Sequence, residues 1–256
     1  MPFQYVSVEE AVQHGGLRMV VVGSVPSPWG EAAKGMLHIK GIEWVAVRLV
    51  YDSDLLEKLA GQRNGPVAVY ENERPRAGWA EILLLAERLA PAPPLLPADP
   101  AERALVFGLS HEICGEAGLG WSRRLRLIHL GLQNAGGFSE RVAKYLGAKY
   151  GYSPEAATAA GPRVAALLAM LAGRLKMQRE AGSPYLVGHS VTAVDVYSAA
   201  FAAMFRPLPP EHCEMDTRTR AAFELRDADT DAALDPILLE HRDMMYAQHL
   251  ELPLSL

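Results

Sequence analysis

The segment Ser24–Lys34, SVPSPWGEAAK, places a serine where a loop meets the start of a predicted helix. The residues before it, RMVVVG, form an apolar run typical of a strand. A helix N-terminus carries free N–H groups and a partial positive charge, so it stabilises an anion such as a thiolate. The Ser27 hydroxyl could donate a hydrogen bond to that anion. A structural role also fits, with Ser27 as the helix cap and Pro28 at the first helical position.

A proline directly before a predicted strand is the second feature of this kind. The segment Arg63–Val67, RNGPV, places Pro66 between a turn and that strand, a position that suits a cis peptide bond. A cis proline would leave the preceding carbonyl and N–H free to pair with an extended ligand, as an added strand does. A plain turn before an edge strand explains the same residues, so both interpretations stay open.

Basic residues gather beside a tryptophan in the second half of the chain. Arg123, Arg124 and Arg126 follow Trp121 closely. They could line a pocket for an anion, but the pattern favours a solvated basic helix face.

Histidine spacing predicts no metal site. The segment His111–Gly115, HEICG, begins like a zinc-protease motif, which needs a second histidine where Gly115 stands. His241 and His249 are eight residues apart, two turns along one helix face, and this spacing favours a solvated helix side rather than a ligand pair.

Strands and helices are predicted to alternate over the first 90 residues, and they must position Ser27 and Pro66. The patterns predict an α/β arrangement, a sheet covered by helices, with an extra N-terminal helix capped by Ser7. The expected strands are Arg18–Val22, Trp44–Val50 and Val67–Tyr70, and the expected helices are Glu31–Lys40, Asp54–Ala60 and Trp79–Ala90.

A proline-rich segment, APAPPLLPADP at Ala90–Pro100, predicts a linker, because its prolines fit neither a helix interior nor a central strand. The sequence therefore divides into residues 1–90, with an extension to about residue 16, a linker over 91–100, and an all-helical domain over 101–256. The helices expected there are Glu102–Glu116, Ser139–Tyr150, Pro154–Glu180, Ala193–Phe205 and Pro236–His249.

Bulk properties exclude several classes of partner. The chain has 256 residues and a net charge of −5, which argues against a nucleic-acid backbone as the main partner. We expect no membrane segment and no secretory signal. The two cysteines do not make a disulfide framework, so we expect a cytoplasmic protein with both thiols reduced.

These features together resemble the cytosolic glutathione transferase family over roughly residues 17–249. The match rests on the βαβ start with Ser-Pro-aromatic at its first helix, KGIEW before the second strand, Pro66, and the proline-rich linker. The most specific stretch is YLVGHSVTAVDVYSAA, in which Thr192 and Asp195 occupy the positions of a helix capping box. The resemblance implies a thioredoxin-like N-terminal domain, an all-α C-terminal domain and a homodimer.

The resemblance also implies roles for single residues. Ser27 falls at the position of the family's catalytic serine or cysteine, with Trp29 beside it. Pro66 matches the family's cis-proline, and Gly65 would offer its backbone to the cysteinyl part of glutathione. A redox dithiol would need cysteine at Ser27 and Gly30, so disulfide exchange is excluded here.

The chain departs from the family where the γ-glutamyl group is usually held. Members that bind glutathione carry Glu-Ser 11 and 12 residues beyond the cis-proline, and here Ala77 and Gly78 stand there. Each lost hydrogen bond to a charged group should cost about 1.5–3 kcal/mol of binding free energy. Arg76 could take a carboxylate by a bidentate contact, although a solvated loop arginine is the simpler interpretation.

The resemblance implies an enzyme that activates glutathione, as co-substrate, or a related thiol and conjugates it to an electrophilic small molecule. Substrate contacts would come from Trp29, Gly65, Pro66, Arg76 and Gly78, and from the start of the helical domain through His111, Trp121 and Arg124. The alternative is a non-catalytic protein of the same architecture that has lost glutathione binding.

Overall fold

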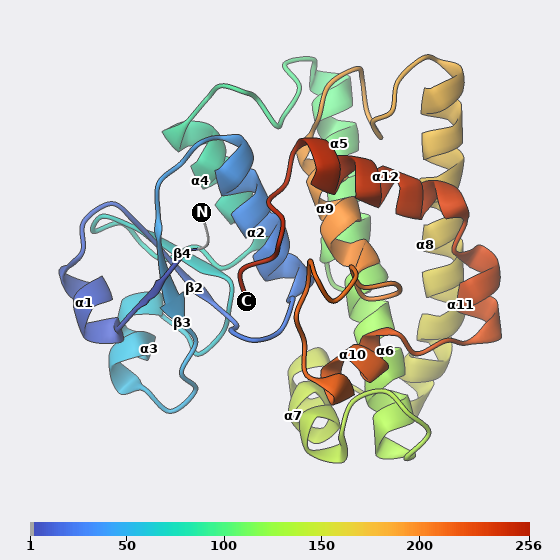
Figure 1. The fold of residues 1–256 in the computed structure, drawn as a ribbon, viewed down its shortest axis with the longest axis horizontal. Helices are drawn as coiled ribbons and strands as arrows, with labels where there is room; N and C mark the ends of the chain where they lie inside the picture. The colour runs from blue at the N-terminus through green and yellow to red at the C-terminus, as the bar shows by residue number, and fades with distance from the viewer. Residues whose placement is uncertain (1–2) are drawn as a thin grey trace.

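A computed structural model of the chain describes residues 3–256. A small sheet with helices on both faces lies on the left in Figure 1, and a group of long helices lies on the right. The predicted fold class, a thioredoxin-like α/β domain followed by an all-α domain, is confirmed by the order of the elements.

The sheet has the strand order β1-β3-β2-β4. Its strands are β1 (Tyr5–Val6), β2 (Leu17–Val21), β3 (Val45–Arg48) and β4 (Val67–Tyr70). β2 pairs parallel with β3 and antiparallel with β4, and β1 adds to the outer edge of β3. A single bridge between Ala68 and Arg76 extends the other edge. The ends of β2 and β4 therefore bring the loop before Ser27 close to the loop that holds Pro66.

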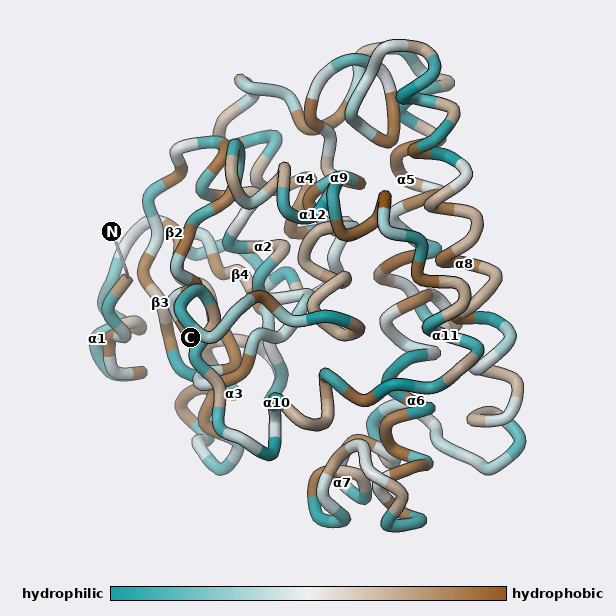
Figure 2. Tube along the Cα trace, turned by 45° about the vertical axis from the view of Figure 1, so that its right-hand side comes forward, coloured by the Kyte–Doolittle hydropathy of each residue, from teal (hydrophilic) through white to brown (hydrophobic). Residues whose placement is uncertain are grey.

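The residues of β2 alternate between two cores because successive side chains of a strand point to opposite faces. Leu17, Met19 and Val21 pack with α2 and α4, whereas Val20 packs in a smaller cluster with α1 and α3. Figure 2 shows hydrophobic residues in brown along these central strands. The helices of this part are α1 (Val8–Gln13), α2 (Pro28–Ile39), α3 (Asp54–Ala60) and α4 (Trp79–Leu89).

The second part of the chain is helical throughout its described elements. They are α5 (Pro100–Cys114), α6 (Leu119–Leu132), α7 (Glu140–Tyr150), α8 (Pro154–Glu180), α9 (Ala193–Ala202), α10 (Thr217–Phe223), α11 (Ala228–Ala233) and α12 (Pro236–Gln248). By length and composition alone α8 could cross a membrane. It packs beside α6 in Figure 1, however, and buries Leu167, Leu168 and Leu171 in the main core.

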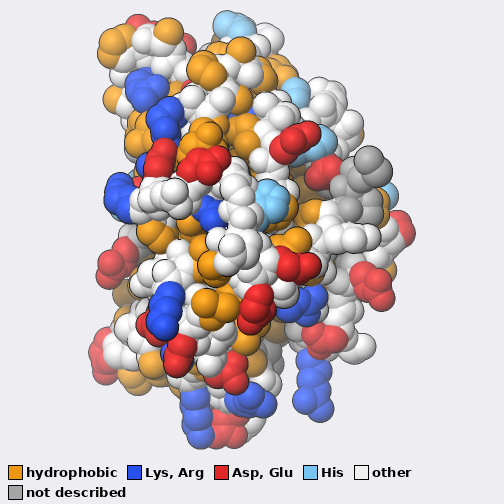
Figure 3. Space-filling model, turned by 90° about the vertical axis from the view of Figure 1, so that its left-hand side faces the viewer, with side chains coloured by type: hydrophobic (Ala, Val, Ile, Leu, Met, Phe, Trp, Pro, Cys, Tyr) orange, Lys and Arg blue, Asp and Glu red, His pale blue; other side chains and the backbone are white. Residues whose placement is uncertain are grey.

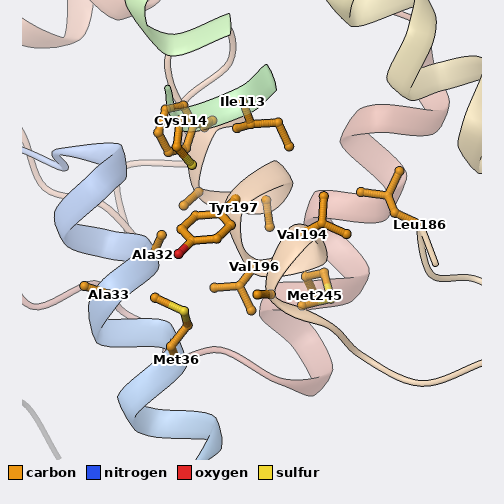
Figure 4. Packing of buried hydrophobic residues seen from close by; sticks show 14 of the residues in the cluster. Ala32, Ala33, Met36, Ile113, Cys114, Leu186, Val194, Val196, Tyr197 and Met245 are labelled. Atoms are coloured by element: carbon orange, nitrogen blue, oxygen red, sulfur yellow. The ribbon is translucent and has the colours of Figure 1, made fainter. Parts of the chain in front are cut away.

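The two parts meet where α2 packs against α9. Ala32, Ala33 and Met36 of α2 face Val196 and Tyr197 of α9 in Figure 4. Small side chains on α2 allow the two helices to approach closely, and burial of these apolar groups stabilises the contact. The start of α2, which carries Ser27, is thereby fixed against the helical domain.

The capping box at the start of α9 is confirmed. The Asp195 carboxylate accepts the backbone N–H of Thr192 at 2.9 Å and its hydroxyl at 2.8 Å. It also accepts the N–H of Leu186 at 2.8 Å and lies 3.0 Å from His241 Nε2. His241 is buried, so the predicted solvated helix side was wrong there.

Most predicted elements agree with the structure to within a few residues. The sequence patterns missed β1, α6, α10 and α11. The sequence of α6 contains arginines and glycines among its apolar residues, so its pattern does not indicate which face of the helix is buried. Figure 3 shows the left-hand face of Figure 1, where the described side chains mix both signs of charge, unlike the continuous basic stripe of a nucleic-acid-binding surface.

Candidate functional site

Ser27 occupies the N-cap position of α2, with Pro28 at the first helical position. Its carbonyl accepts the first helical N–H, that of Glu31, at 2.7 Å, but its side chain makes no capping hydrogen bond. The residue is half-buried. A Cβ added at Gly30 would lie 3.6 Å from the Ser27 Cβ, so no side chain of residue 30 covers the serine. The hydroxyl is therefore at a helix N-terminus without serving as its cap.

The loop before β4 lies against the end of β2. The Gly65–Pro66 peptide bond is cis. A Cβ added at Gly65 would lie 3.3 Å from the Val20 carbonyl oxygen and 3.4 Å from the Val22 nitrogen, so this residue packs on the strand end that leads to Ser27. The Gly65 N–H donates to Asn64 Oδ1 at 2.9 Å. An extended ligand that paired with this N–H would have to displace that contact.

Trp29 joins the start of α2 to the helical domain. Its indole N–H donates to the Cys114 carbonyl at the end of α5, at 2.9 Å. Its ring contacts Phe201 edge-on, with the centroids 4.8 Å apart. Gly120 on α6 makes room for this pair, because an added Cβ would lie 2.3 Å from a Phe201 ring carbon and 3.1 Å from Trp29.

Arg124 and Trp121 approach Trp29 from α6. Arg124 is only 7% exposed, and its guanidinium carbon lies 6.0 Å from the centre of the Trp29 ring. Arg123 is also buried, so the solvated basic face that the sequence favoured was wrong for both arginines. The Tyr150 ring lies between the two tryptophans, 4.7 Å from Trp121 and 6.3 Å from Trp29.

Residues of α7 reach across to the sheet-containing domain, and the sequence patterns did not identify them. Lys149 Nζ donates to Asn64 Oδ1 at 2.6 Å, beside the cis-proline loop. Tyr145 packs edge-on against Tyr51, which follows β3, at 5.5 Å. At the end of a helix Lys149 has the pattern of a solvated basic residue, so no local signal could have revealed this contact.

Three predicted site residues lie apart from this group. Arg76 pairs with Glu73 at 2.5 Å, and Gly78 is the N-cap of α4, where its N–H donates to Glu81 Oε2 at 3.3 Å. His111 is exposed on α5, with its ring 6.4 Å from Trp79. Ala77 is exposed as well. The roles predicted for Arg76, Gly78 and His111 stay predictions.

Neither cysteine supplies a reactive thiolate next to Ser27. Burial raises the pKa of the Cys114 thiol well above its ordinary value and that of Cys213 to about 11. The thiolate is the reactive form, so both buried thiols are inert at neutral pH. No group of three or more His, Cys, Asp or Glu side chains that could hold a metal occurs among residues 3–256.

Comparison with known proteins supports the assignment of the helical domain. Residues 139–223 match the sequence model of the family described as glutathione S-transferase, C-terminal domain. Comparison with curated protein sequences finds no match.

Solved structures share the fold over nearly the whole chain. A glutathione S-transferase from Methylobacterium radiotolerans, in complex with glutathione sulfonate, has 21% identity and a TM-score of 0.57 and covers 91% of both chains. A rice glutathione S-transferase in complex with glutathione has 21% identity and a TM-score of 0.59 over 94% of both chains. A glutathione S-transferase domain-containing protein of Marinobacter aquaeolei has 17% identity and a TM-score of 0.62, covering 90% of this chain and 98% of its own.

The fold is thus the two-domain fold of the glutathione S-transferase structures. The domain match over residues 139–223 and the structural neighbours show that this chain is similar to glutathione S-transferases.

Proposed function

We propose that the chain activates the thiol of glutathione, or of a related molecule, at Ser27 and conjugates it to an electrophilic small molecule held by the helical domain. The observation that carries this proposal is the Ser27 hydroxyl, half-buried at the N-terminus of the 12-residue helix α2 and free of a capping bond. A hydroxyl donor and a helix N-terminus both favour thiolate over thiol, so they would raise the fraction of attacking nucleophile at neutral pH.

The cis-proline loop supports the same ligand class. Gly65 and Pro66 lie against the end of β2, so an extended thiol peptide could lie along this loop with its sulfur toward Ser27. The neighbours solved with glutathione and glutathione sulfonate also support it. We further infer a cytoplasmic homodimer, as expected for this architecture.

A second candidate function is a glutathione S-transferase-like binding protein without glutathione. The side chains of Ala77 and Gly78 cannot hydrogen-bond a γ-glutamyl group, and the Gly65 N–H already donates to Asn64 Oδ1. Both observations lower the affinity expected for glutathione.

Two measurements on the full chain separate the candidates. The first is the thermal denaturation midpoint with and without millimolar reduced glutathione, with cysteine as the control ligand. The second is glutathione conjugation to 1-chloro-2,4-dinitrobenzene, followed by absorbance. A rise in the midpoint together with conjugation supports the enzyme, whereas the absence of both supports the binding protein. A rise without conjugation of this reagent or a panel of other electrophiles would overturn the catalytic role.

A further inference from the structure

Arg124 is a buried cation that has no anionic partner among residues 3–256. It is 7% exposed, and its Nε is sealed from solvent with no hydrogen-bond partner. Three aromatic rings surround it, with its guanidinium carbon 5.3 Å from Phe138, 5.7 Å from Phe223 and 6.0 Å from Trp29. Cation–π contacts offset part of the cost of burying this charge, but an ion pair or full hydrogen bonding normally accompanies such burial.

The neighbouring arginine shows what a structural guanidinium looks like in the same helix. Arg123 donates to Asp227 at 3.2 Å, to the Met204 carbonyl at 3.2 Å and to the Leu225 carbonyl at 2.7 Å. All three nitrogens of the Arg123 guanidinium therefore donate hydrogen bonds. Within residues 3–256, Arg124 makes neither an ion pair nor a hydrogen bond to a carbonyl. Its structural contacts therefore do not explain why a charged side chain is buried at this position.

A second cation lies close to Arg124. The Lys149 ammonium lies 5.6 Å from the centre of the Tyr150 ring, and that ring lies 6.3 Å from Trp29, over which the Arg124 guanidinium packs. Burial lowers the pKa of Lys149, and the charge of Arg124 lowers it further. Burial likewise lowers the pKa of Arg124, and the groups that oppose this effect are the tyrosines Tyr150 and Tyr51, not a carboxylate. The only polar partner of the Lys149 ammonium in the described structure is the neutral amide of Asn64.

We propose that Arg124 and Lys149 bind the carboxylate of an aromatic acid, which is the second substrate of the site. This inference rests on the proposed function, because it takes the thiol to lie on the Ser27 side of Trp29. A planar guanidinium matches a carboxylate through two parallel hydrogen bonds, and the Nη atoms of Arg124, unlike Nε, are not sealed.

The surroundings favour a flat ligand body. Trp121 and Tyr150 present aromatic faces next to the two cations, and with Lys149 they line a groove of about 630 Å³ between α6, α7 and α8. The groove gives a small molecule access to Lys149 from the surface, and Arg124 is not among its lining residues. Aromatic rings pack well on such walls in offset or edge-on arrangements.

Calorimetric titration of the full chain tests the proposal without any thiol present. The probes are 4-nitrobenzoate and its uncharged counterpart 4-nitrobenzamide. We expect the wild type to bind the benzoate at least tenfold more tightly than the benzamide. Arg124→Met should abolish this preference and Lys149→Met should weaken it, whereas Arg126→Met, a control in the same helix, should leave it unchanged.

Melting temperatures of the variants distinguish a loss of benzoate binding from a loss of the folded structure. Replacing an unpaired buried cation by an apolar side chain is neutral or stabilising, so the Arg124→Met melting temperature should equal or exceed that of the wild type. If that variant nevertheless fails to fold, Lys149→Met decides the result, because the residue as a whole is solvent-exposed although its ammonium is partly desolvated at Asn64.

Three results would overturn the proposal. The wild type could bind 4-nitrobenzoate and 4-nitrobenzamide equally, or the Arg124→Met variant could keep the preference for the benzoate. The Arg124→Met variant could also lose glutathione binding while keeping benzoate binding. The last result would assign the carboxylate to the thiol ligand. Failure of the Ser27 role is separate, because it would change conjugation rates and leave benzoate binding intact.

Discussion

The indole N–H of Trp29 donates to the carbonyl of Cys114 over 2.9 Å, and this bond ties the start of α2 to the end of α5. The two helices belong to different parts of the molecule. Ser27 lies two residues before Trp29, so its position depends on both the sheet-containing part and the helical part. A change at this contact should therefore affect the stability of the fold and the placement of the candidate catalytic hydroxyl together.

Trp29→Phe tests this contact, because phenylalanine keeps an aromatic ring and removes the donor. We expect the free energy of unfolding to fall by about 1–3 kcal/mol, since a partly buried carbonyl loses its partner. Urea denaturation measures the change. Trp44→Phe is the matched control, since Trp44 is also half-buried and makes no indole hydrogen bond within residues 3–256. Equal losses in the two variants would contradict the role of the bond.

Ser27→Ala tests the proposed thiol activation. Conjugation should slow about tenfold or more, and the apparent pKa of the glutathione thiol in the pH–rate profile should rise, because one donor to the thiolate is removed. Stability should change by less than about 0.5 kcal/mol, since the side chain makes no capping bond. Ser139→Ala, at another N-cap without a side-chain bond, should leave both the rate and the profile unchanged. An unaltered rate in Ser27→Ala would end the assignment.

Gly120→Ala tests the close approach of α6 to Trp29 and Phe201. The added methyl group would lie 2.3 Å from a Phe201 ring carbon, so the rings must shift, at a cost of about 1–3 kcal/mol of stability. Gly108→Ala in α5 is the control, because its added methyl group meets nothing within 4 Å. That variant should gain about 0.5–1 kcal/mol from better helix propensity. Chemical denaturation should show a lower free energy of unfolding for Gly120→Ala and a higher one for Gly108→Ala. A change of the same sign in both variants would contradict the packing argument.

Asp227→Asn tests the ion pair of the buried Arg123. Burial alone would raise the pKa of Asp227, but hydrogen bonds from Thr230 and the charge of Arg123 hold it below its ordinary value. The unfolded carboxyl therefore binds a proton at higher pH than the folded one, so this stabilisation is complete above the unfolded pKa and is lost as the pH falls through the folded one. At pH 7 the variant should be less stable by about 1–3 kcal/mol.

The difference between Asp227→Asn and the wild type should shrink as the pH falls below the ordinary aspartate pKa of about 4 and approaches the lower pKa of the folded carboxyl. Thermal denaturation between pH 7 and pH 3 measures this. Asp216→Asn, at the exposed N-cap of α10, is the control and should cost less at pH 7. A difference that stays constant across the pH range would show that the charge of Asp227 is not responsible.

Local patterns were sufficient for the elements of the sheet-containing part. The bounds of Asp54–Ala60 and Val67–Tyr70 agree with α3 and β4, since capping and β-branched residues act over a few positions. The patterns failed at α6, where Arg123 and Arg124 suggested a solvated face. Their burial depends on Asp227 and on the rings of Phe138 and Phe223, none of which adjoins them in the chain.

The sequence by itself determined the two-part architecture, the place of Ser27 at a helix start and the absence of polar side chains at Ala77 and Gly78. These features depend on residue type, spacing and short-range backbone preferences. Only the tertiary structure decided that Arg124 has no anionic partner within residues 3–256, that Lys149 donates a hydrogen bond to Asn64 and that Trp29 donates one to the Cys114 carbonyl. Such contacts join residues 85 positions apart in the latter two cases, and long-range packing brings them together.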